Sequence, residues 1–207
     1  MRTKSLILVL TLVAISAGAQ TVGQTVAALA AARGCDPIDQ ICDHLIADRG
    51  ATRVLITSMS EDDIRTIVSS ATALVGSDGN CVATYGIVGQ GLPHPRFYGT
   101  FPRIIGHYVH DERLIPLEQA IYKMTGGPAK ALKLRDRGLL KVGYRADVAI
   151  FDPADFRDEA TYVTPHRYPS GRRTTVFVNG TVVVENAVHT GATPGAVLRR
   201  AADGTVG

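Results

Sequence analysis

The sequence contains no tryptophan, and aromatic residues make up only 6% of its 207 residues. It also lacks an H-E-x-x-H pair, a G-x-S-x-G elbow, a P-loop and a dinucleotide-binding fingerprint. Each of these motifs supports a particular chemistry: zinc proteolysis, serine hydrolysis or nucleotide binding. Their absence argues against a zincin protease, an α/β-type serine hydrolase and a nucleotide-dependent enzyme of the kinds that use them.

Charge of one sign is not in large excess, because 22 Lys and Arg stand against 19 Asp and Glu and give a net charge of +3. The basic residues do not form the clustered patch typical of nucleic-acid-binding proteins, so no nucleic-acid partner is expected. A hydrophobic content of 45% is typical of a globular chain. The chain is nevertheless too short for a complete (β/α)₈ barrel, which takes about 250 residues.

The first residues have the pattern of an export signal. Arg2 and Lys4 precede an apolar run from Leu6 to Ile15, and small residues follow up to Ala19. This order of basic, apolar and small residues is typical of a cleaved secretory signal. We therefore expect residues 1–19 to be a signal peptide and the mature protein to be periplasmic or secreted. No second apolar run is long enough to span a bilayer, so no membrane anchor is expected.

Three cysteines, Cys35, Cys42 and Cys81, are an odd number for an exported chain. The Asp36-Pro37 pair predicts the start of a helix, which places Cys42 roughly 10 Å along the axis from Cys35 at a rise of ~1.5 Å per residue. A disulfide cannot bridge that distance without distortion. We expect the cysteines to be small buried hydrophobic residues rather than a redox or metal site.

The first half of the chain predicts alternating helices and strands. Capping signals and apolar periodicity indicate helices over residues 24–33, 36–47 and 60–70. Short apolar runs at 53–57 and 73–77 predict strands between and after them. Such alternation is typical of a parallel α/β layer.

The second half changes character. Residues 81–103 are rich in Gly and Pro and are expected to be irregular, whereas helices are predicted at 104–113, 116–126 and 128–134. From residue 138 onward antiparallel β-structure is expected, with a hairpin at Asn179-Gly180. The prediction is an α/β fold: residues 20–137 form the last units of a barrel, and residues 138–207 form a small antiparallel β domain.

Two segments could carry chemistry. Asp78 follows a predicted strand, where a carboxylate of an α/β barrel can ligate a metal or take a proton, although Ser-Asp-Gly is also ordinary turn chemistry. Pro93 and Pro95 are expected to stiffen a loop that presents His94 and Arg96, and a guanidinium matches a carboxylate in two-point contact. An arginine beside a catalytic aspartate favours an anionic substrate, but Arg96 could equally tie the loop to its own acceptors.

The remaining histidines give weaker signals. His107 and His110 are three residues apart on a predicted helix and so share a face. Two neutral imidazoles could bind a metal there, but a solvated helix face is the favoured interpretation.

Several motifs together resemble the carboxyl-terminal part of the N-acyl-D-amino-acid deacylases, or D-aminoacylases, of the amidohydrolase superfamily. They are S-D-G at 77–79, H-P-R-x-Y-G-T-F-P-R at 94–103 and P-H-x-Y-P-x-G at 165–171. The G-x-x-A-D-x-x-x-F-D run at 143–152 is shared by many amidohydrolases and is less specific. The similarity extends from about Val22 to Arg200.

The resemblance implies hydrolysis of an N-acyl-D-amino acid to a carboxylate and a D-amino acid. It implies that Asp78 is the catalytic general base and that Arg96 binds the α-carboxylate of the substrate. It also implies a zinc-bound water as the nucleophile. The family's metal ligands, an H-x-H pair, a cysteine and two further histidines, have no counterpart here, so no metal ligand is assigned to this chain.

Three interpretations follow. The chain could be the carboxyl-terminal part of a deacylase, inactive by itself and dependent on a complementing chain or prone to self-association. It could be a non-catalytic exported remnant or binding protein. It could also belong to a relative that acts on cyclic amides, such as a dihydroorotase or hydantoinase, although the motif combination argues against this.

Overall fold

The computed structural model describes residues 10–13, 23–50, 53–56 and 59–207. Most of the predicted signal peptide, residues 1–9 and 14–19, lies outside this described part. Within it, Leu10–Val13 form strand β1, which lies between two partners in a small sheet. Cleavage near Ala19 would remove this central strand; export and cleavage remain predictions.

The amino-terminal unit combines this sheet with two helices, α1 (Val26–Arg33) and α2 (Pro37–Ala47). The strand order is β2-β1-β3, with β2 at Gln24–Thr25 and β3 at Arg53–Ile56. Both pairings are antiparallel, so the predicted parallel layer is wrong for these residues. Periodicity identifies strands along a chain, but their direction depends on which strands meet in space.

The predicted helix starts are confirmed. The Asp36 side chain accepts a hydrogen bond from the Ile38 N–H at 2.8 Å, and Pro37 occupies the first turn of α2, where its missing N–H costs nothing. In helix α3 (Glu61–Ser69), Ser60 caps the Asp63 N–H at 3.1 Å. Helix α1 ends at Gly34, whose φ of 69° is accessible to glycine without a Cβ clash.

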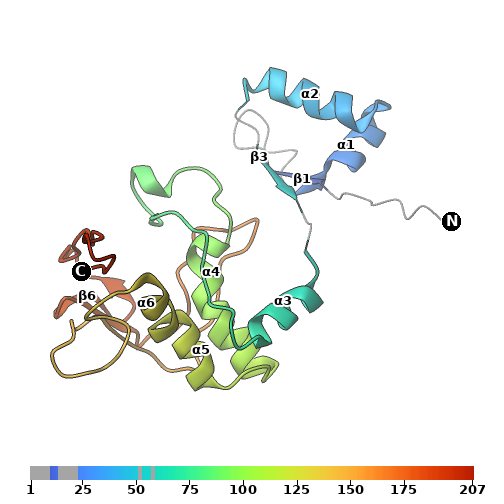
Figure 1. The fold of residues 1–207 in the computed structure, drawn as a ribbon. Helices are drawn as coiled ribbons and strands as arrows, with labels where there is room; N and C mark the ends of the chain where they lie inside the picture. The colour runs from blue at the N-terminus through green and yellow to red at the C-terminus, as the bar shows by residue number, and fades with distance from the viewer. Residues whose placement is uncertain (1–9, 14–22, 51–52, 57–58) are drawn as a thin grey trace.

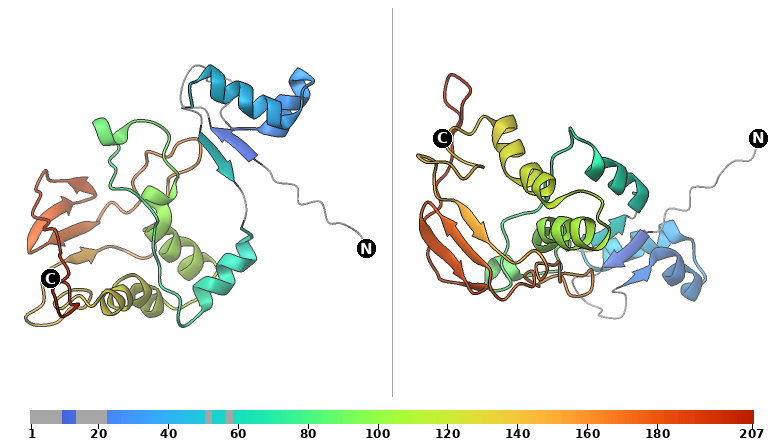
Figure 2. Two further views of the ribbon diagram at one scale, coloured as in Figure 1. Left: turned by 45° about the horizontal axis from the view of Figure 1, so that its top comes forward. Right: turned by 90° about the horizontal axis from the view of Figure 1, so that it is seen from below.

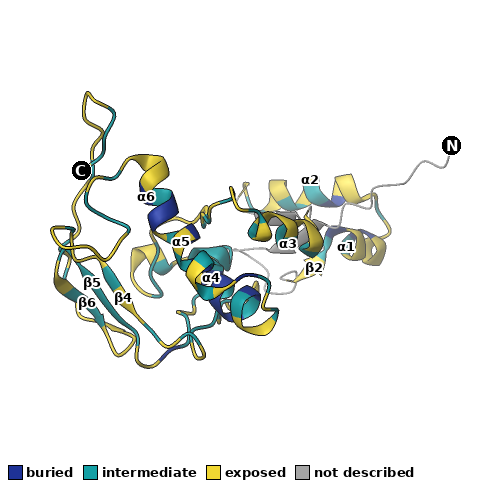
Figure 3. Cartoon of the chain, turned by 60° about the horizontal axis from the view of Figure 1, so that its bottom comes forward, coloured by how far each residue is buried: buried dark blue, intermediate teal, exposed yellow. Residues whose placement is uncertain are grey.

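The middle of the chain is a helical layer that contains most of the core (Figure 1, Figure 3). Its elements are α4 (Arg96–Arg103), the π-helix η2 (Ile104–Asp111), α5 (Leu117–Met124) and α6 (Gly126–Leu132). The buried cluster consists of Ile104, Ile105, Tyr108, Ile115 and Ala120. The helices predicted at 104–113, 116–126 and 128–134 are confirmed, although the first has π geometry.

The prediction that 81–103 contains no regular element is wrong. The 3₁₀ turn η1 (Ile87–Gly89) lies within the segment, and α4 occupies its end despite Pro102. Pro95 takes the N-cap position, where proline loses no helical hydrogen bond. Pro102 lacks the N–H that would continue the α-helical ladder, and the chain passes into the π-helix two residues later. Pro95 therefore lies at the start of a helix and Pro102 in its last turn, where an irregular segment was expected.

The strand predicted at 73–77 is also absent, since residues 73–83 belong to no helix or strand. Lys123 of α5 holds this stretch instead. Its Nζ, on a residue only 2% exposed, donates to the carbonyl oxygens of Ser70 and Ala73, and the Val75 N–H donates to the Lys123 carbonyl at 3.1 Å. A strand needs a neighbouring strand, and the described residues place a helix beside this stretch.

The carboxyl-terminal sheet has the order β4-β5-β6-β7 and is antiparallel throughout, as predicted. Its strands are β4 (Val148–Ile150), β5 (Thr175–Val178), β6 (Thr181–Glu185) and β7 (Val188–His189). Asn179 and Gly180 join β5 to β6 with φ of 49° and 81°, the conformation that an Asn-Gly hairpin turn requires. Figures 1 and 2 show this sheet and the amino-terminal unit at opposite ends of the helical layer.

Asp147, from the G-x-x-A-D run, fastens the hairpin to the rest of the chain. Its Oδ1 accepts the Asn179 N–H at 2.8 Å, and its Oδ2 binds the Arg137 guanidinium. Arg137 Nη2 in turn donates to Asn179 Oδ1 at 2.9 Å, so one carboxylate accepts both a turn N–H and Nη1 of a largely buried arginine. The least specific motif of the sequence thus has a structural role in this chain.

We expect Asp147→Ala to lower the free energy of unfolding by about 2 kcal/mol, because it removes the acceptor of a turn N–H and of Nη1 of Arg137. Urea denaturation followed by circular dichroism measures the change. Glu159→Gln, at an exposed carboxylate, is the matched control and should change stability little. Equal effects of the two substitutions would contradict the role of Asp147.

The cysteines are free, as expected, but they are not all buried. Cys35 is half-buried, whereas Cys42 and Cys81 are exposed. Cys42 lies on a face of α2 turned to solvent and Cys81 lies in the long loop, so the expectation of three small core residues is wrong. No helix in the described residues is long and apolar enough to cross a membrane.

Candidate functional site

Asp78 and Arg96, the two residues singled out by sequence, lie in direct contact. Arg96 Nη2 is 2.8 Å from Asp78 Oδ2, and Arg96 Nε donates to the Asp78 carbonyl oxygen at 3.0 Å. Asp78 therefore occupies the edge of the guanidinium formed by Nε and Nη2. The loop between them brings together residues that are 18 positions apart.

Local backbone geometry sets the position of each partner. Asp78 has a φ of 48°, in the left-handed region, and the next N–H, of Gly79, donates to Ser77 Oγ at 3.2 Å. This tight turn directs the Asp78 side chain outward, where it is 87% exposed. Arg96 is the first residue of α4 rather than part of a loop, and its guanidinium lies 5.7 Å from the centroid of the Phe97 ring.

His94 supports the same site. Its Nδ1 accepts the Arg96 N–H at 3.0 Å, and its ring meets Tyr162 edge-on, with centroids 5.1 Å apart. Burial lowers the pKa of His94, the positive charge of Arg96 lowers it further, and Asp78 opposes the shift. His94 is therefore uncharged at neutral pH.

The H-P-R and P-H-x-Y-P motifs, about 70 residues apart in sequence, pack against each other. Besides the His94–Tyr162 contact, the Tyr98 ring lies 5.8 Å from Tyr168. Both tyrosines also hold the loop after Asp78: Tyr98 Oη donates to the Ala83 carbonyl at 2.7 Å, and the Thr84 N–H donates to Tyr168 Oη at 3.3 Å. The two motifs and the loop thus form one continuous support around Arg96.

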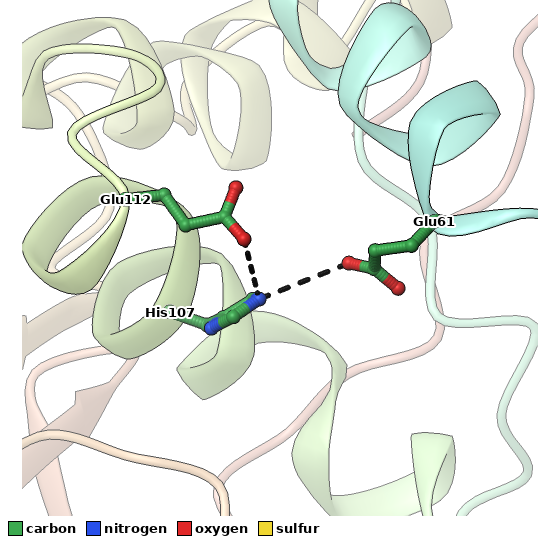
Figure 4. A group of neighbouring side chains, drawn as sticks. All are labelled: Glu61, His107 and Glu112. Carbon is green, nitrogen blue, oxygen red and sulfur yellow. Dashed lines mark ion pairs between the residues drawn. The ribbon is translucent and has the colours of Figure 1, made fainter.

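A second polar cluster lies between α3 and η2 (Figure 4). His107 Nε2 is 3.0 Å from Glu112 Oε1 and 3.8 Å from Glu61 Oε1. One ligand atom from each of the three residues lies within 4.8 Å of the others, which is close enough to surround a cation. Sequence analysis missed both glutamates, because Glu61 has the pattern of a first-turn helix residue and Glu112 that of an exposed charge.

The partners of these carboxylates do not fit a catalytic zinc. Arg65 binds both oxygens of Glu112, at 2.9 and 2.8 Å, and Tyr108 Oη donates to Glu61 Oε1 at 2.7 Å. A zinc ion would have to displace the Arg65 guanidinium from Glu112, whereas a catalytic site keeps three ligands and an open position. The described residues hold no other group of three metal-ligating side chains, and the remainder of the sequence contains no His, Cys, Asp or Glu.

His107 and His110 do not form a metal pair. His107 faces Glu61 and Glu112, whereas His110 contacts Asp111 at 3.2 Å and Arg157 at 2.9 Å. A shared face for residues three apart belongs to α-helical geometry, and η2 is a π-helix with a wider turn. His110 is exposed, as expected for a solvated face, whereas His107 is half-buried, and both belong to ion networks that tie η2 to its neighbours.

These networks predict a loss of stability in acid. Hydrogen bonds from Arg157 lower the pKa of Asp111 to about 2, and those from Arg65 lower the pKa of Glu112. A lowered carboxylate pKa stabilises the fold fully above the unfolded value of about 4 and loses that effect as the pH falls toward the folded value.

We therefore expect the thermal midpoint to fall steeply between about pH 4 and pH 2. A double variant that combines Glu112→Gln with Asp111→Asn should have a lower thermal midpoint at pH 7. Its midpoint should also depend less on pH in the acid range. Glu159→Gln should leave the dependence unchanged. An equally steep acid loss in the double variant would contradict the assignment.

Residues 12–184 match the sequence model described as the amidohydrolase family. The chain belongs to this family. The D-aminoacylase of Alcaligenes xylosoxydans xylosoxydans is 38% identical over 183 residues, which cover 81% of this chain and 36% of that amidohydrolase. The resemblance to D-aminoacylases predicted from the motifs is confirmed.

Solved structures of amidohydrolases are also similar to this chain. A crystal structure of D-aminoacylase superposes on this chain with a TM-score of 0.72 at 32% identity. The superposed region covers 89% of this chain and 36% of the D-aminoacylase chain. N-acyl-D-glutamate deacylase from Bordetella bronchiseptica, in complex with zinc and a phosphonate inhibitor, gives a TM-score of 0.69 at 32% identity, with 86% and 35% covered. The chain therefore spans about a third of the length of these amidohydrolases.

The structure supports part of the predicted fold. It shows an α/β chain with an antiparallel carboxyl-terminal sheet, but every pairing between its named strands is antiparallel in the described residues. The partial barrel and the division at residue 138 therefore stay predictions, as do the roles of Asp78 and Arg96.

Proposed function

We propose that this chain supplies the carboxylate-binding arginine and the general base of an N-acyl-D-amino-acid deacylase. The observation that carries the proposal is the contact between Arg96 and Asp78 at 2.8 Å, on a chain similar to deacylases over most of its length. A substrate with a free carboxylate and a neighbouring amide would meet a cation and a carboxylate base side by side.

Arg96 can bind a carboxylate without releasing Asp78. Among the described residues its hydrogen bonds and ion pair use the N–H, Nε and Nη2, and Nη1 makes none. The Nη1–Nη2 edge of a guanidinium accepts a carboxylate in a two-point contact. Arg96 is 40% exposed, so this edge is accessible to a small anion from solvent.

Asp78 can act as a base because its carboxylate is accessible from solvent. Amide hydrolysis requires removal of a proton from the attacking water and delivery of a proton to the departing nitrogen. An exposed carboxylate held in a fixed turn can take and return that proton. The described residues do not fit a catalytic zinc, so we propose that the metal ligands belong to polypeptide outside this sequence, as a complementing part.

Complementation tests the proposal. Joining this chain to the part of a D-aminoacylase that it does not cover, in the presence of zinc, should yield release of D-methionine from N-acetyl-D-methionine. The 207-residue chain with zinc should give no turnover. Turnover by the chain alone, abolished by a chelator, would contradict the missing-ligand proposal, and a folded but inactive hybrid would contradict the deacylase proposal.

A non-catalytic binding protein is the second candidate, favoured by the lack of a zinc-compatible cluster in the described residues. It would bind the N-acyl-D-amino acid but give no turnover in the folded hybrid. A hydantoin in the same assay tests the cyclic-amide interpretation.

Export is also proposed, and mass spectrometry of protein from the cell envelope would show whether the chain begins near Gln20.

A further inference from the structure

We propose that His94 is a positioning residue that fixes Arg96 for binding of a substrate carboxylate. The inference rests on the proposed function of Arg96 and goes beyond it by assigning the residue that sets its geometry. Three contacts carry it: one to the Arg96 main chain, one to Tyr162, and the contact of Arg96 itself with Asp78.

The first contact replaces a missing helix cap. The first N–H groups of a helix have no partner within the helix and are usually satisfied by the side chain at the N-cap. In α4 the N-cap is Pro95, whose side chain has no acceptor. The His94 ring takes this role, because its Nδ1 accepts the Arg96 N–H at 3.0 Å. The backbone from which the Arg96 side chain extends is thereby fixed.

The second contact fixes the ring itself. Since Nδ1 accepts a hydrogen bond, the proton of the neutral imidazole resides on Nε2. Nε2 can then donate to Tyr162 Oη, which lies 3.3 Å away. The two rings meet at 86° with centroids 5.1 Å apart, an edge-on packing that restricts rotation of the imidazole. Tyr162 thus connects the segment before the P-H-x-Y-P motif to Arg96.

Together these contacts leave one defined surface of Arg96 for a ligand. His94 holds its main chain, and Asp78 holds the Nε–Nη2 edge. The Nη1–Nη2 edge is left to a carboxylate, and a guanidinium already fixed in place loses less conformational entropy on binding. Loss of the His94 contact would let the first turn of α4 fray and the guanidinium change direction.

Protonation of His94 should have the same effect as its removal. A protonated Nδ1 is a donor and cannot accept the Arg96 N–H, so this hydrogen bond would be lost. The charged and titratable groups that face the ring are Arg96, Asp78 and Tyr162. Burial and Arg96 hold the pKa of His94 below its ordinary value of about 6.5, so the cap is present at neutral pH and is lost only as the pH falls through this lowered pKa.

Nuclear magnetic resonance of the full 207-residue chain tests the proposal directly. The ¹⁵N shifts of the His94 ring should show an unprotonated Nδ1 and a protonated Nε2 at pH 7.5. His94→Ala should remove the exchange protection of the Arg96 N–H and shift its Nε–H signal. His94→Asn should restore both, because asparagine accepts an N–H two residues ahead in the same way.

A matched control exists in the same chain. His189 Nδ1 accepts the Gly191 N–H at 3.0 Å, the same local bond at a site without Arg96. His189→Ala should leave the Arg96 signals unchanged. Titration with N-acetyl-D-methionine should show about tenfold weaker binding for His94→Ala and near-normal binding for His94→Asn and His189→Ala.

The outcomes separate the two proposals. A wild-type chain that binds no N-acyl-D-amino acid contradicts the proposed function, whereas the Arg96 signals of the variants still decide the role of His94. Arg96 signals that do not change in His94→Ala, or a ring protonated on Nδ1 at pH 7.5, would overturn the positioning role.

Discussion

Asp78→Asn is expected to lower the turnover number of the completed enzyme about 10³-fold, the usual scale for loss of a general base. Asparagine keeps the size of the side chain and the main-chain carbonyl that accepts Arg96 Nε, but it cannot take a proton. KM should change little, because Arg96 retains its second edge for the substrate. Steady-state kinetics with N-acetyl-D-methionine, using the hybrid described above, measures both constants.

The control for this experiment is Glu159→Gln, which removes a carboxylate from an exposed position. It should leave turnover within about twofold of the parent, as expected for a surface substitution. A turnover number that Asp78→Asn leaves unchanged would remove Asp78 from the catalytic machinery. The contact with Arg96 would then be a structural ion pair.

Arg96→Ala is expected to raise KM about 100-fold with a much smaller change in the turnover number. A carboxylate held equally in the ground state and the transition state contributes to KM and not to the chemical step. Loss of one partner from a hydrogen-bonded charge pair accounts for an effect of this size. The ratio of KM values for the parent and the variant is the measurement.

Substrate variation gives the discriminating control. The methyl ester of N-acetyl-D-methionine has no carboxylate charge, so its KM should respond little to Arg96→Ala. Arg96→Lys should recover part of the affinity for the acid, because it keeps the charge and loses the two-point geometry. Equal changes for the acid and the ester would show that Arg96 acts on the fold and not on the substrate.

Local signals in the sequence predicted local structure well. Asp36-Pro37 and Ser60 predicted where helices begin, and Asn179-Gly180 predicted the hairpin, since each depends on hydrogen bonds or dihedral angles within a few residues. From the sequence we considered Arg96 beside Asp78, and the resemblance to a family implied their roles; the structure places the two side chains in contact.

Predictions that depended on distant partners were less successful. The strand expected before Asp78 does not form, because Lys123 and not a neighbouring strand satisfies that backbone. The shared face expected for His107 and His110 does not form, because η2 is a π-helix and its histidines face different ion networks. Glu61 and Glu112 gave no signal, since their meeting requires α3 to pack against η2.

The sequence by itself therefore determined the starts of α2 and α3, the hairpin turn, the family and the two residues proposed for chemistry. The tertiary structure alone decided the strand directions of the amino-terminal sheet and the pairing of Arg65 with Glu112 in the Glu61–His107–Glu112 cluster. It also decided the support of Arg96 by His94 and Tyr162, which lie 68 positions apart. The physical reason is range: caps and turns are satisfied within a few residues, whereas charge pairs and strand pairs depend on which distant segments meet.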